Sequence, residues 1–366
     1  MATSKVLVVG SGVIGLRTAL ELLQRNIHVH LLSPCHPIHP STCSMGAGGL
    51  WMPFHCDDYR VDRWAHETLS ELLTKNDGVV EMLSAVAFKR NQNVLPNWAT
   101  NNTELLFQQL SINELYKESK SQSFRLPRRD VMIDAGYRYA WLFQTPIVNC
   151  PKYLVNMLDE IKDHPYTDFV DVETQKYYKT IEEMVRDATK LGCDGVINCT
   201  GLGSKELCND TSLVGARGIL LHYDRSSCVW MENEDQQSES ISSDGLKDSV
   251  ILIEEPPFGS ETHPCYSIPR GNIIAVGGTY LEGDNTADIR ELEREKIVQN
   301  AQSMGIDIDK SKPVSEWVGF RPIRSTSRLE LERIKGVKVV HSYGYGGSGW
   351  TVFAGAAREA ASLMQI

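Results

Sequence analysis

The sequence predicts an α/β fold in which strands and helices alternate around three glycine-rich turns. The first turn follows an apolar strand at Lys5 to Val9, and the second follows another apolar strand within Asp194 to Ser204 (DGVINCTGLGS). The third is the cluster Gly344 to Gly349, which precedes a helical segment from about Trp350 to Met364. Glycine lets backbone turn tightly and approach another molecule closely, so the three turns predict a ligand site assembled from distant parts of the chain.

The N-terminal segment is typical of a Rossmann-like βαβ unit. The strand, the turn GSGVIG and an amphipathic helical stretch are followed by a second strand at His28 to Leu32. In the turn, Gly10 permits the bend, Gly12 lets backbone approach a pyrophosphate, and Gly15 lets the helix pack closely on the strand. The helix N-terminus offers N–H donors to phosphates, so we expect this unit to bind a dinucleotide.

The residue after the second strand favours FAD over NAD. An acidic residue for the ribose is expected there, and the sequence has Ser33. FAD is held along its whole length by several segments, so the loss of one contact matters less for FAD. Glycine-rich helix starts at opposite ends of the chain also suggest one long cofactor between them. An NAD-dependent dehydrogenase stays the alternative.

Hydrophobic periodicity predicts most of the remaining elements. The segment from Cys35 to about Trp51 is rich in Pro, Ser and Gly and predicts a loop close to a ligand, and the acidic span Asn233 to Lys247 predicts an exposed loop. Helices are expected at Asp57 to Leu73, Lys152 to Ile161, Ile181 to Leu191 and Asp288 to Ser303, and strands at Asp168 to Val172, Val250 to Ile253, Tyr266 to Pro269 and Asn272 to Tyr280.

Composition excludes several classes of partner. The chain has 366 residues and a formal net charge of -10, without a Lys/Arg run that could follow a phosphate backbone, so no nucleic acid is expected. No stretch reaches the ~20 apolar residues that cross a bilayer, so no membrane association is expected. The nine cysteines lack metal-binding spacing and are expected to be reduced in an intracellular protein, with no metal site.

Arg321 is the candidate for binding a carboxylate. It follows strand-like residues in EWVGFRPIR and precedes a proline, which would fix its backbone. A planar guanidinium in a walled site suits bidentate capture of a carboxylate. An arginine at a strand end is more often a surface ion-pair residue, so this role depends on its surroundings.

The chain resembles the D-amino-acid oxidase and D-aspartate oxidase family over nearly its full length. The resemblance lies in seven motifs that occur in the family's order, and this ordering is more specific than any one motif. They are VVGSGVIGL, AGGLWMPF, VINCTGLGS, ARG at Ala216 to Gly218, YSIPRGNIIAVGGTY, VGFRPIR and HSYGYGGSGWT.

The resemblance implies a set of site residues by position. Arg321 would bind the substrate carboxylate, the Tyr266 hydroxyl would support the same carboxylate, and the backbone carbonyl of Gly347 would accept a hydrogen bond from the substrate amine. Met52, Phe54 and Met231 would line the side-chain pocket, which favours neutral D-amino acids. The cofactor-binding set would comprise Gly10, Gly12, Val13, Ile14, Gly15, Thr42, Gly49, Leu50, Gly201, Gly346, Gly347, Gly349 and Thr351.

The implied activity is oxidative deamination of a neutral D-amino acid with FAD and O2, giving a 2-oxo acid, ammonia and hydrogen peroxide. No side-chain base is needed if the substrate amine is neutral when the hydride leaves its Cα. A D-aspartate oxidase is the nearest alternative, because Arg225 lies six residues from Met231 and could supply a second cation. A more distant alternative is a flavoprotein that binds FAD without catalysing a reaction.

The implied architecture is a discontinuous Rossmann-like FAD-binding domain interleaved with a mixed-sheet α+β substrate domain. We assign residues 1–60, 145–215 and 321–366 to the FAD-binding domain and residues 61–144 and 216–320 to the substrate domain. The candidate assembly is a homodimer, and the sequence leaves the oligomeric state open. The sequence departs from the family's pattern at Ile219, Thr262 and Asn285, where glutamine, a lid tyrosine and tryptophan are usual. The family implies the peroxisome, whereas the ending MQI, which is not an SKL-type address, would favour the cytoplasm.

Overall fold

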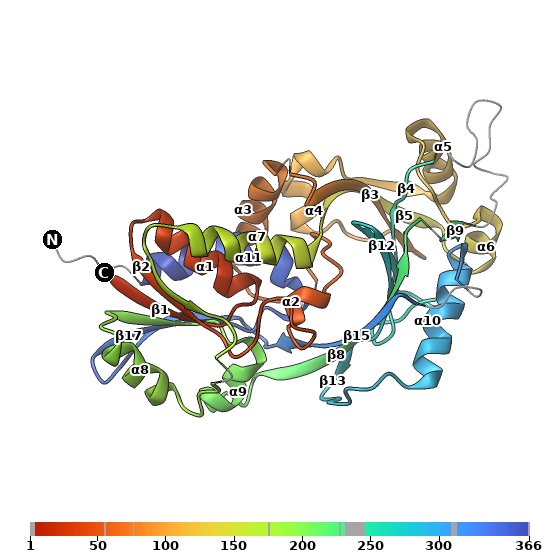
Figure 1. Cartoon of the computed structure of the whole chain (residues 1–366). Helices are drawn as coiled ribbons and strands as arrows, with labels where there is room; N and C mark the ends of the chain where they lie inside the picture. Colours follow the sequence, from red (N-terminus) through yellow and green to blue (C-terminus); the bar gives the residue numbers. More distant parts are fainter. Residues whose placement is uncertain are drawn as a thin grey trace.

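The computed structural model contains two β-sheets that lie side by side, each with its own helices (Figure 1). It describes residues 4–54, 56–75, 77–174, 176–226, 228–230, 246–308 and 313–364. We call the six-stranded sheet the parallel sheet and the nine-stranded sheet the mixed sheet, after the pairing of their described strands. The chain passes repeatedly between them, so each sheet combines strands from distant parts of the sequence.

The parallel sheet has six strands among the described residues, in the order β16-β17-β7-β1-β2-β6. They are β1 (Lys5–Val9), β2 (His28–Leu32), β6 (Thr167–Asp171), β7 (Gly195–Asn198), β16 (Arg328–Ile334) and β17 (Val337–Tyr343). Neighbours are parallel except for the hairpin of β16 and β17. Val6 and Val8 face one hydrophobic core and Leu7 and Val9 face another, so both faces of the sheet are buried.

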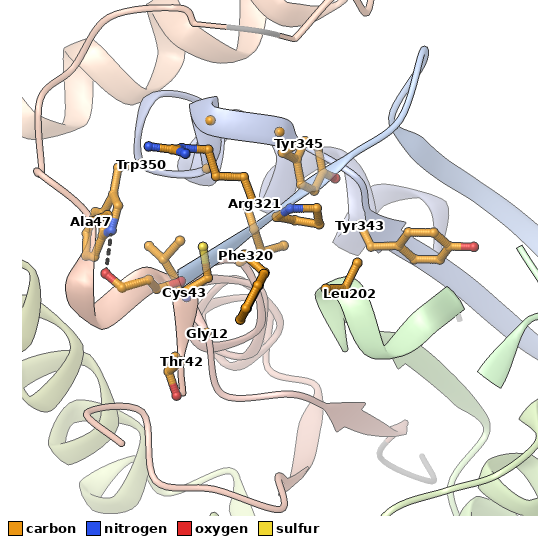
Figure 2. A pocket seen from close by; sticks show the side chains of 18 of the residues that line it. Gly12, Thr42, Cys43, Ala47, Leu202, Phe320, Arg321, Tyr343, Tyr345 and Trp350 are labelled. Carbon is orange, nitrogen blue, oxygen red and sulfur yellow. Dashed lines mark hydrogen bonds between the residues drawn. The ribbon is translucent and has the colours of Figure 1, made fainter. Parts of the chain in front are cut away.

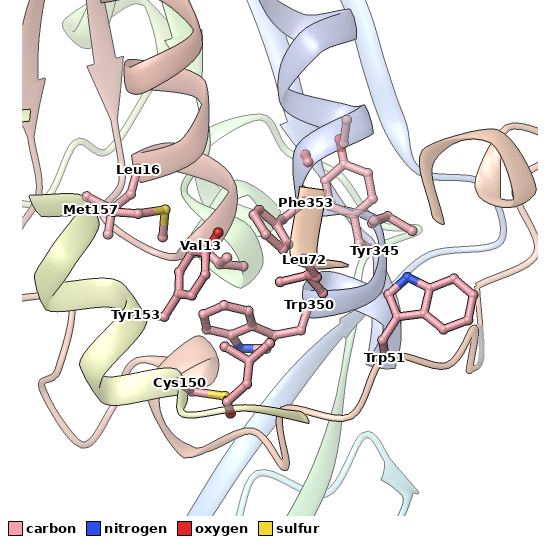
Figure 3. Close-up of a cluster of buried hydrophobic side chains, with 14 of the residues drawn as sticks. Val13, Leu16, Trp51, Leu72, Cys150, Tyr153, Met157, Tyr345, Trp350 and Phe353 are labelled. Carbon is pink, nitrogen blue, oxygen red and sulfur yellow. The ribbon is translucent and has the colours of Figure 1, made fainter. Parts of the chain in front are cut away.

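Helices cover both faces of the parallel sheet (Figure 1). One face carries α1 (Val13–Gln24), α3 (Val61–Leu73), α7 (Cys150–Asp163) and α11 (Gly349–Leu363), and the other carries α8 (Ile181–Lys190). Helix α1 packs between α7 and α11. Figure 3 shows the aromatic centre of this contact, where the Trp350 ring meets Tyr153 at 5.6 Å and Phe353 at 5.7 Å between ring centroids. Such edge-to-face pairs fix the N-terminus of α11 against α7.

The mixed sheet has nine strands among the described residues, in the order β13-β8-β12-β11-β10-β3-β5-β4, with β15 on the other side of β8. They are β3 (Val80–Lys89), β4 (Gln108–Ser111), β5 (Tyr139–Val148), β8 (Val214–Asp224), β10 (Val250–Ile253), β11 (Cys265–Arg270), β12 (Ile273–Gly277), β13 (Leu281–Glu282) and β15 (Ser315–Ile323). One face packs its Ile219, Leu221 and Ile251 side chains in a core with α5 (Ile112–Gln122) and α10 (Glu291–Ser303). The opposite face, with Leu220 and Leu252, belongs to the core of α1 and α11.

Several short elements complete the described chain. They are α2 (Cys43–Gly46), α4 (Asn97–Asn101), α6 (Arg129–Asp134) and α9 (Ser204–Leu207), the 3₁₀ turns η1 (Thr103–Leu105), η2 (Gly201–Gly203) and η5 (Gly346–Ser348), and the paired strands β9 (Val229–Trp230) and β14 (Ile306–Asp307). No helix within the described ranges is long and apolar enough to span a bilayer.

The structure confirms the α/β fold class and most of the predicted elements. The strands at His28–Leu32 and Val250–Ile253 have their predicted bounds. The helix predicted from Asp57 begins at Val61, because the Asp58 carboxylate accepts a hydrogen bond from the Arg60 N–H and holds the preceding residues in a turn. The loop predicted at residues 233–247 falls almost entirely outside the described residues.

The domain boundaries stay a prediction, although the strands show where the chain changes sheets. Strand β5 stays in the mixed sheet until Val148, past the predicted boundary at residue 144. Strand β15 carries Arg321 to Ile323 in the mixed sheet, past the predicted boundary at residue 320. Arg321 therefore belongs to the same sheet as Tyr266.

Candidate functional site

The three glycine-rich turns meet around one cavity of about 590 Å³. Its walls come from the turn between β1 and α1, the loop around α2, the turn after β7, the N-terminus of α11, and the adjoining face of the mixed sheet. Figure 2 shows how close these segments lie, with Gly12, Thr42, Leu202 and Trp350 around the same space. More than 300 residues separate the first turn from the third, and the fold brings all three together.

The first turn has the backbone that its glycines predict. Gly10 has a φ of +112°, a conformation that residues with side chains rarely adopt, and an added Cβ would lie 2.8 Å from the carbonyl carbon of Cys199, directly after β7. Gly12 caps the N-terminus of α1 and lines the cavity. Gly15 lies outside the cavity wall and packs on the backbone of Gly10. The turn therefore presents the positive end of α1 to the cavity.

Two further glycines leave room at the cavity wall. An added Cβ at Gly201 or Gly349 would meet no atom within 4 Å, although both residues line the cavity. Gly349 begins α11, a helix of 15 residues, so a second positive helix end faces the same space. A cradle of small residues with two helix N-termini fits a long ligand with phosphate groups.

The segment Met52 to Phe54 is fixed to the start of α11. The Thr351 hydroxyl accepts a hydrogen bond from the Met52 N–H at 3.2 Å and donates one to its carbonyl at 2.9 Å. Ser348 does the same for Phe54, at 2.7 and 2.8 Å. Thr351 is buried and does not line the cavity, so it holds the cavity wall in place from behind.

The Arg321 side chain extends from β15 into the cavity (Figure 2). Its Nη1 donates a hydrogen bond of 3.0 Å to the Thr279 carbonyl. The guanidinium lies directly over Gly218 of β8, where an added Cβ would be 2.7 Å from Cζ. Arg321 is thus held against the mixed sheet beside Tyr266, and its planar guanidinium presents N–H donors to the cavity.

Tyr266 and Tyr280 flank this guanidinium. Burial raises the pKa of the Tyr266 phenol, and the positive charge of Arg321 partly opposes that rise. Burial likewise raises the pKa of Tyr280 to about 12. The Tyr280 ring faces the guanidinium, with 5.6 Å from Cζ to the ring centroid, and meets the Phe54 ring edge-to-face at 6.1 Å. Both phenols are therefore neutral at physiological pH and can act as hydrogen-bond donors.

The structure brings together most of the residues predicted from sequence. Gly15 and Thr351 support the cavity without lining it, and Met231 lies outside the described residues. Those that line the cavity are Gly10, Gly12, Val13, Ile14, Thr42, Gly49, Leu50, Met52, Phe54, Gly201, Tyr266, Arg321, Gly346, Gly347 and Gly349.

Other cavity residues were not predicted. Trp317 donates a hydrogen bond from Nε1 to the Pro40 carbonyl at 2.9 Å and lies against Gly319, so its position follows from a small residue two places along β15. Burial raises the pKa of the Cys43 thiol, which lies near enough to Arg321 for the guanidinium to oppose the rise. Glu254, directly after β10, also lines the cavity. Only the spacing of Trp317 and Gly319 in the motif WVGF could have suggested one of these positions.

Comparisons with known proteins agree with this geometry. A family model described as FAD dependent oxidoreductase matches residues 5–363. The chain is 27% identical to the D-amino-acid oxidase of Dictyostelium discoideum, covering 98% of this chain and 91% of that protein. It is also 27% identical to D-aspartate oxidase 1 of Caenorhabditis elegans, covering 99% and 97%. A solved L-alpha-glycerophosphate oxidase of Mycoplasma pneumoniae with FAD bound superposes with a TM-score of 0.70 at 16% identity, covering 100% and 96%.

Proposed function

Because the chain belongs to this family of FAD-dependent oxidoreductases, we propose that it is a D-amino-acid oxidase, which dehydrogenates the Cα–N bond of a D-amino acid. The observation that supports this most directly is the Arg321 guanidinium, held over Gly218 at the cavity wall between two neutral tyrosines. The imino acid formed would be hydrolysed by water to a 2-oxo acid and ammonia, and O2 would be reduced to hydrogen peroxide.

FAD is the cofactor of this family, and the cavity has the features that would hold it. The N-termini of α1 and α11 would face its phosphates and ring, and Gly201 and Gly349 leave the space that backbone contact requires. Ser33 lines the cavity at the end of β2, where its hydroxyl accepts a hydrogen bond from Ser11 and donates one to the Cys35 carbonyl. When bound, FAD supplies the hydride acceptor.

The chain's own residues would orient the substrate. Arg321 would bind the α-carboxylate through charge-assisted hydrogen bonds, and Tyr266 would donate a further one, because its phenol stays protonated. The Gly347 carbonyl would accept from the substrate amine, which fixes the direction of the Cα–H bond. Phe54 and Tyr280 would close one side against water. No side-chain base is needed if the amine is already neutral.

The described walls favour neutral D-amino acids over D-aspartate. Phe54, Leu220, Leu252 and Ile268 make the surroundings of Tyr266 largely apolar. A D-aspartate oxidase needs a second cation for the side-chain carboxylate. Arg225, the candidate for that cation, instead pairs with Glu81 at 2.8 Å and Asp248 at 2.7 Å and does not line the cavity.

A flavin spectrum and a peroxide assay test the proposal. The purified protein should show bound flavin and release peroxide with D-alanine, more slowly with D-aspartate and not with L-alanine. Arg321→Ala should raise KM strongly and leave the flavin bound, since Arg321 belongs to the carboxylate site. An unchanged KM in that variant, or activity on the L-enantiomer alone, would refute the assignment.

A further inference from the structure

The cavity carries a carboxylate at its Tyr266 end that the proposed reaction does not use. Glu254 lines the cavity directly after β10. Charged residues along the described wall are few: Lys176, Glu206, Arg321 on β15 and Glu254 directly after β10. Lys176 already pairs with Asp187. The mixed-sheet side of the cavity therefore has one cation and one anion of its own.

Strand register places Glu254 on the same side as the substrate residues. Leu252 of β10 lies directly opposite Tyr266 of β11, and directly opposed residues share a face of the sheet. Glu254 is one residue past the end of β10, and its ion pair with Lys89, which follows Ala87 by two residues on the paired strand β3, keeps it on the face of Leu252, about 7 Å further along. Leu252 thus forms an apolar part of the wall between Tyr266 and Glu254. The cavity thus offers, in order, a site that binds a carboxylate, an apolar wall and the carboxylate of Glu254. This order matches a substrate with an α-carboxylate, an aliphatic stem and a distal cation.

The local charge balance leaves an excess of negative charge beside Glu254. Its one ion-pair partner within the described chain is Lys89, whose Nζ lies 3.5 Å from Oε2. That same Nζ lies 4.0 Å from Glu255, so one buried lysine faces two carboxylates. The Glu254 side chain is 34% exposed, which leaves it accessible to a second cation. A bound ammonium or guanidinium would complete the neutralisation.

We propose that Glu254 determines specificity, and that it selects D-amino acids whose side chain ends in a cation, such as D-lysine and D-arginine. This rests on the proposed function and extends it from neutral side chains to those with a cationic end. Arg321 would bind the α-carboxylate while Leu252 contacts the aliphatic stem. Glu254 would bind the terminal ammonium, and the same carboxylate would repel D-aspartate and D-glutamate.

The test compares substrates that share a stem and differ in charge. The holoenzyme's kcat/KM is measured for D-lysine, D-norleucine and D-glutamate, in the wild type and in Glu254→Gln. We expect D-lysine to exceed D-norleucine by about tenfold in the wild type, and this ratio to fall to about one in the variant. Glu255→Gln is the matched control, since Glu255 also faces Lys89 but does not line the cavity, and it should keep the wild-type ratio.

A binding measurement separates this inference from the proposed reaction. The dissociation constants of 6-aminohexanoate and hexanoate, neither of which has an α-amine to oxidise, are obtained from the change in flavin absorbance. Tighter binding of 6-aminohexanoate that Glu254→Gln abolishes would support the site even if no D-amino acid were oxidised. Equal D-lysine and D-norleucine rates with a ratio unchanged by Glu254→Gln would overturn it and leave the oxidase activity in place. A variant that lost its flavin spectrum would be replaced by Glu254→Met, with the same expected ratio.

Discussion

Adding one methyl group at Gly218 should weaken substrate binding without disturbing the fold. The new Cβ would lie closest to Nη1 of Arg321 and 2.7 Å from Cζ, and an ordinary contact begins at 3.4 Å, so the guanidinium must retreat by about 1 Å. The atoms in conflict belong to the free end of a long side chain, so the backbone of β8 need not move. Misplacement by 1 Å can cost about 100-fold in rate. We therefore expect Gly218→Ala to raise KM between about tenfold and 100-fold, or ~1.4–2.8 kcal/mol.

The assay is steady-state peroxide release with a D-amino acid, alongside the flavin spectrum and the thermal midpoint of unfolding. Gly215→Ala on the same strand is the control, because its Cβ would meet Leu202 and Phe320 and not Arg321. The control should keep the wild-type KM, and both variants should keep their flavin and midpoint. A Gly218→Ala enzyme with an unaltered KM would show that the position of the guanidinium over β8 is not what binds the carboxylate.

Three further substitutions test separate parts of the structure. Tyr266→Phe should raise KM by about three- to tenfold and leave the pH dependence of KM unchanged between pH 7 and 10, because burial raises the phenol's pKa and it stays protonated over that range; a titration lost in the variant would contradict this. Arg217→Met should lower the free energy of unfolding by about 3 kcal/mol in urea titrations, because it removes a buried cation that lies 2.7 Å from Glu293 and leaves that carboxylate with the more exposed Arg290 as its ion-pair partner. Gly10→Ala should yield protein with little flavin, since its Cβ would collide with Cys199; a normal yellow holoenzyme would refute the proposed role of the turn.

The sequence predicted the features that depend on local backbone chemistry. Strand β1, the turn at Gly10 and helix α1 follow from periodicity and glycine spacing, and the structure has them where expected. The hairpin of β16 and β17 follows from two strand-like runs around Lys335 and Gly336, both of which have positive φ. These elements need only information that lies within about a dozen residues of each other.

Contacts between distant segments could not be read in the same way. The resemblance implies Met231 for the side-chain pocket, from a loose alignment of the strand after Arg217, and Met231 lies outside the described residues. Leu252 and Glu254 line the cavity near Tyr266, because β10 pairs with β11. Pairing between strands depends on the registry of the whole sheet, which no local pattern encodes.

The hydrogen bonds that hold the segment from Met52 to Phe54 against α11 have a consequence for biosynthesis. The cavity needs backbone from residue 10 and hydroxyls from residues 348 and 351, and α11 covers the buried side of α1. A nascent chain therefore holds an unfinished pocket, with the inner surface of α1 uncovered, until α11 has been made. The flavin can be captured only after α11 has folded onto α1, so the supply of the cofactor at that moment decides how long the exposed surface persists.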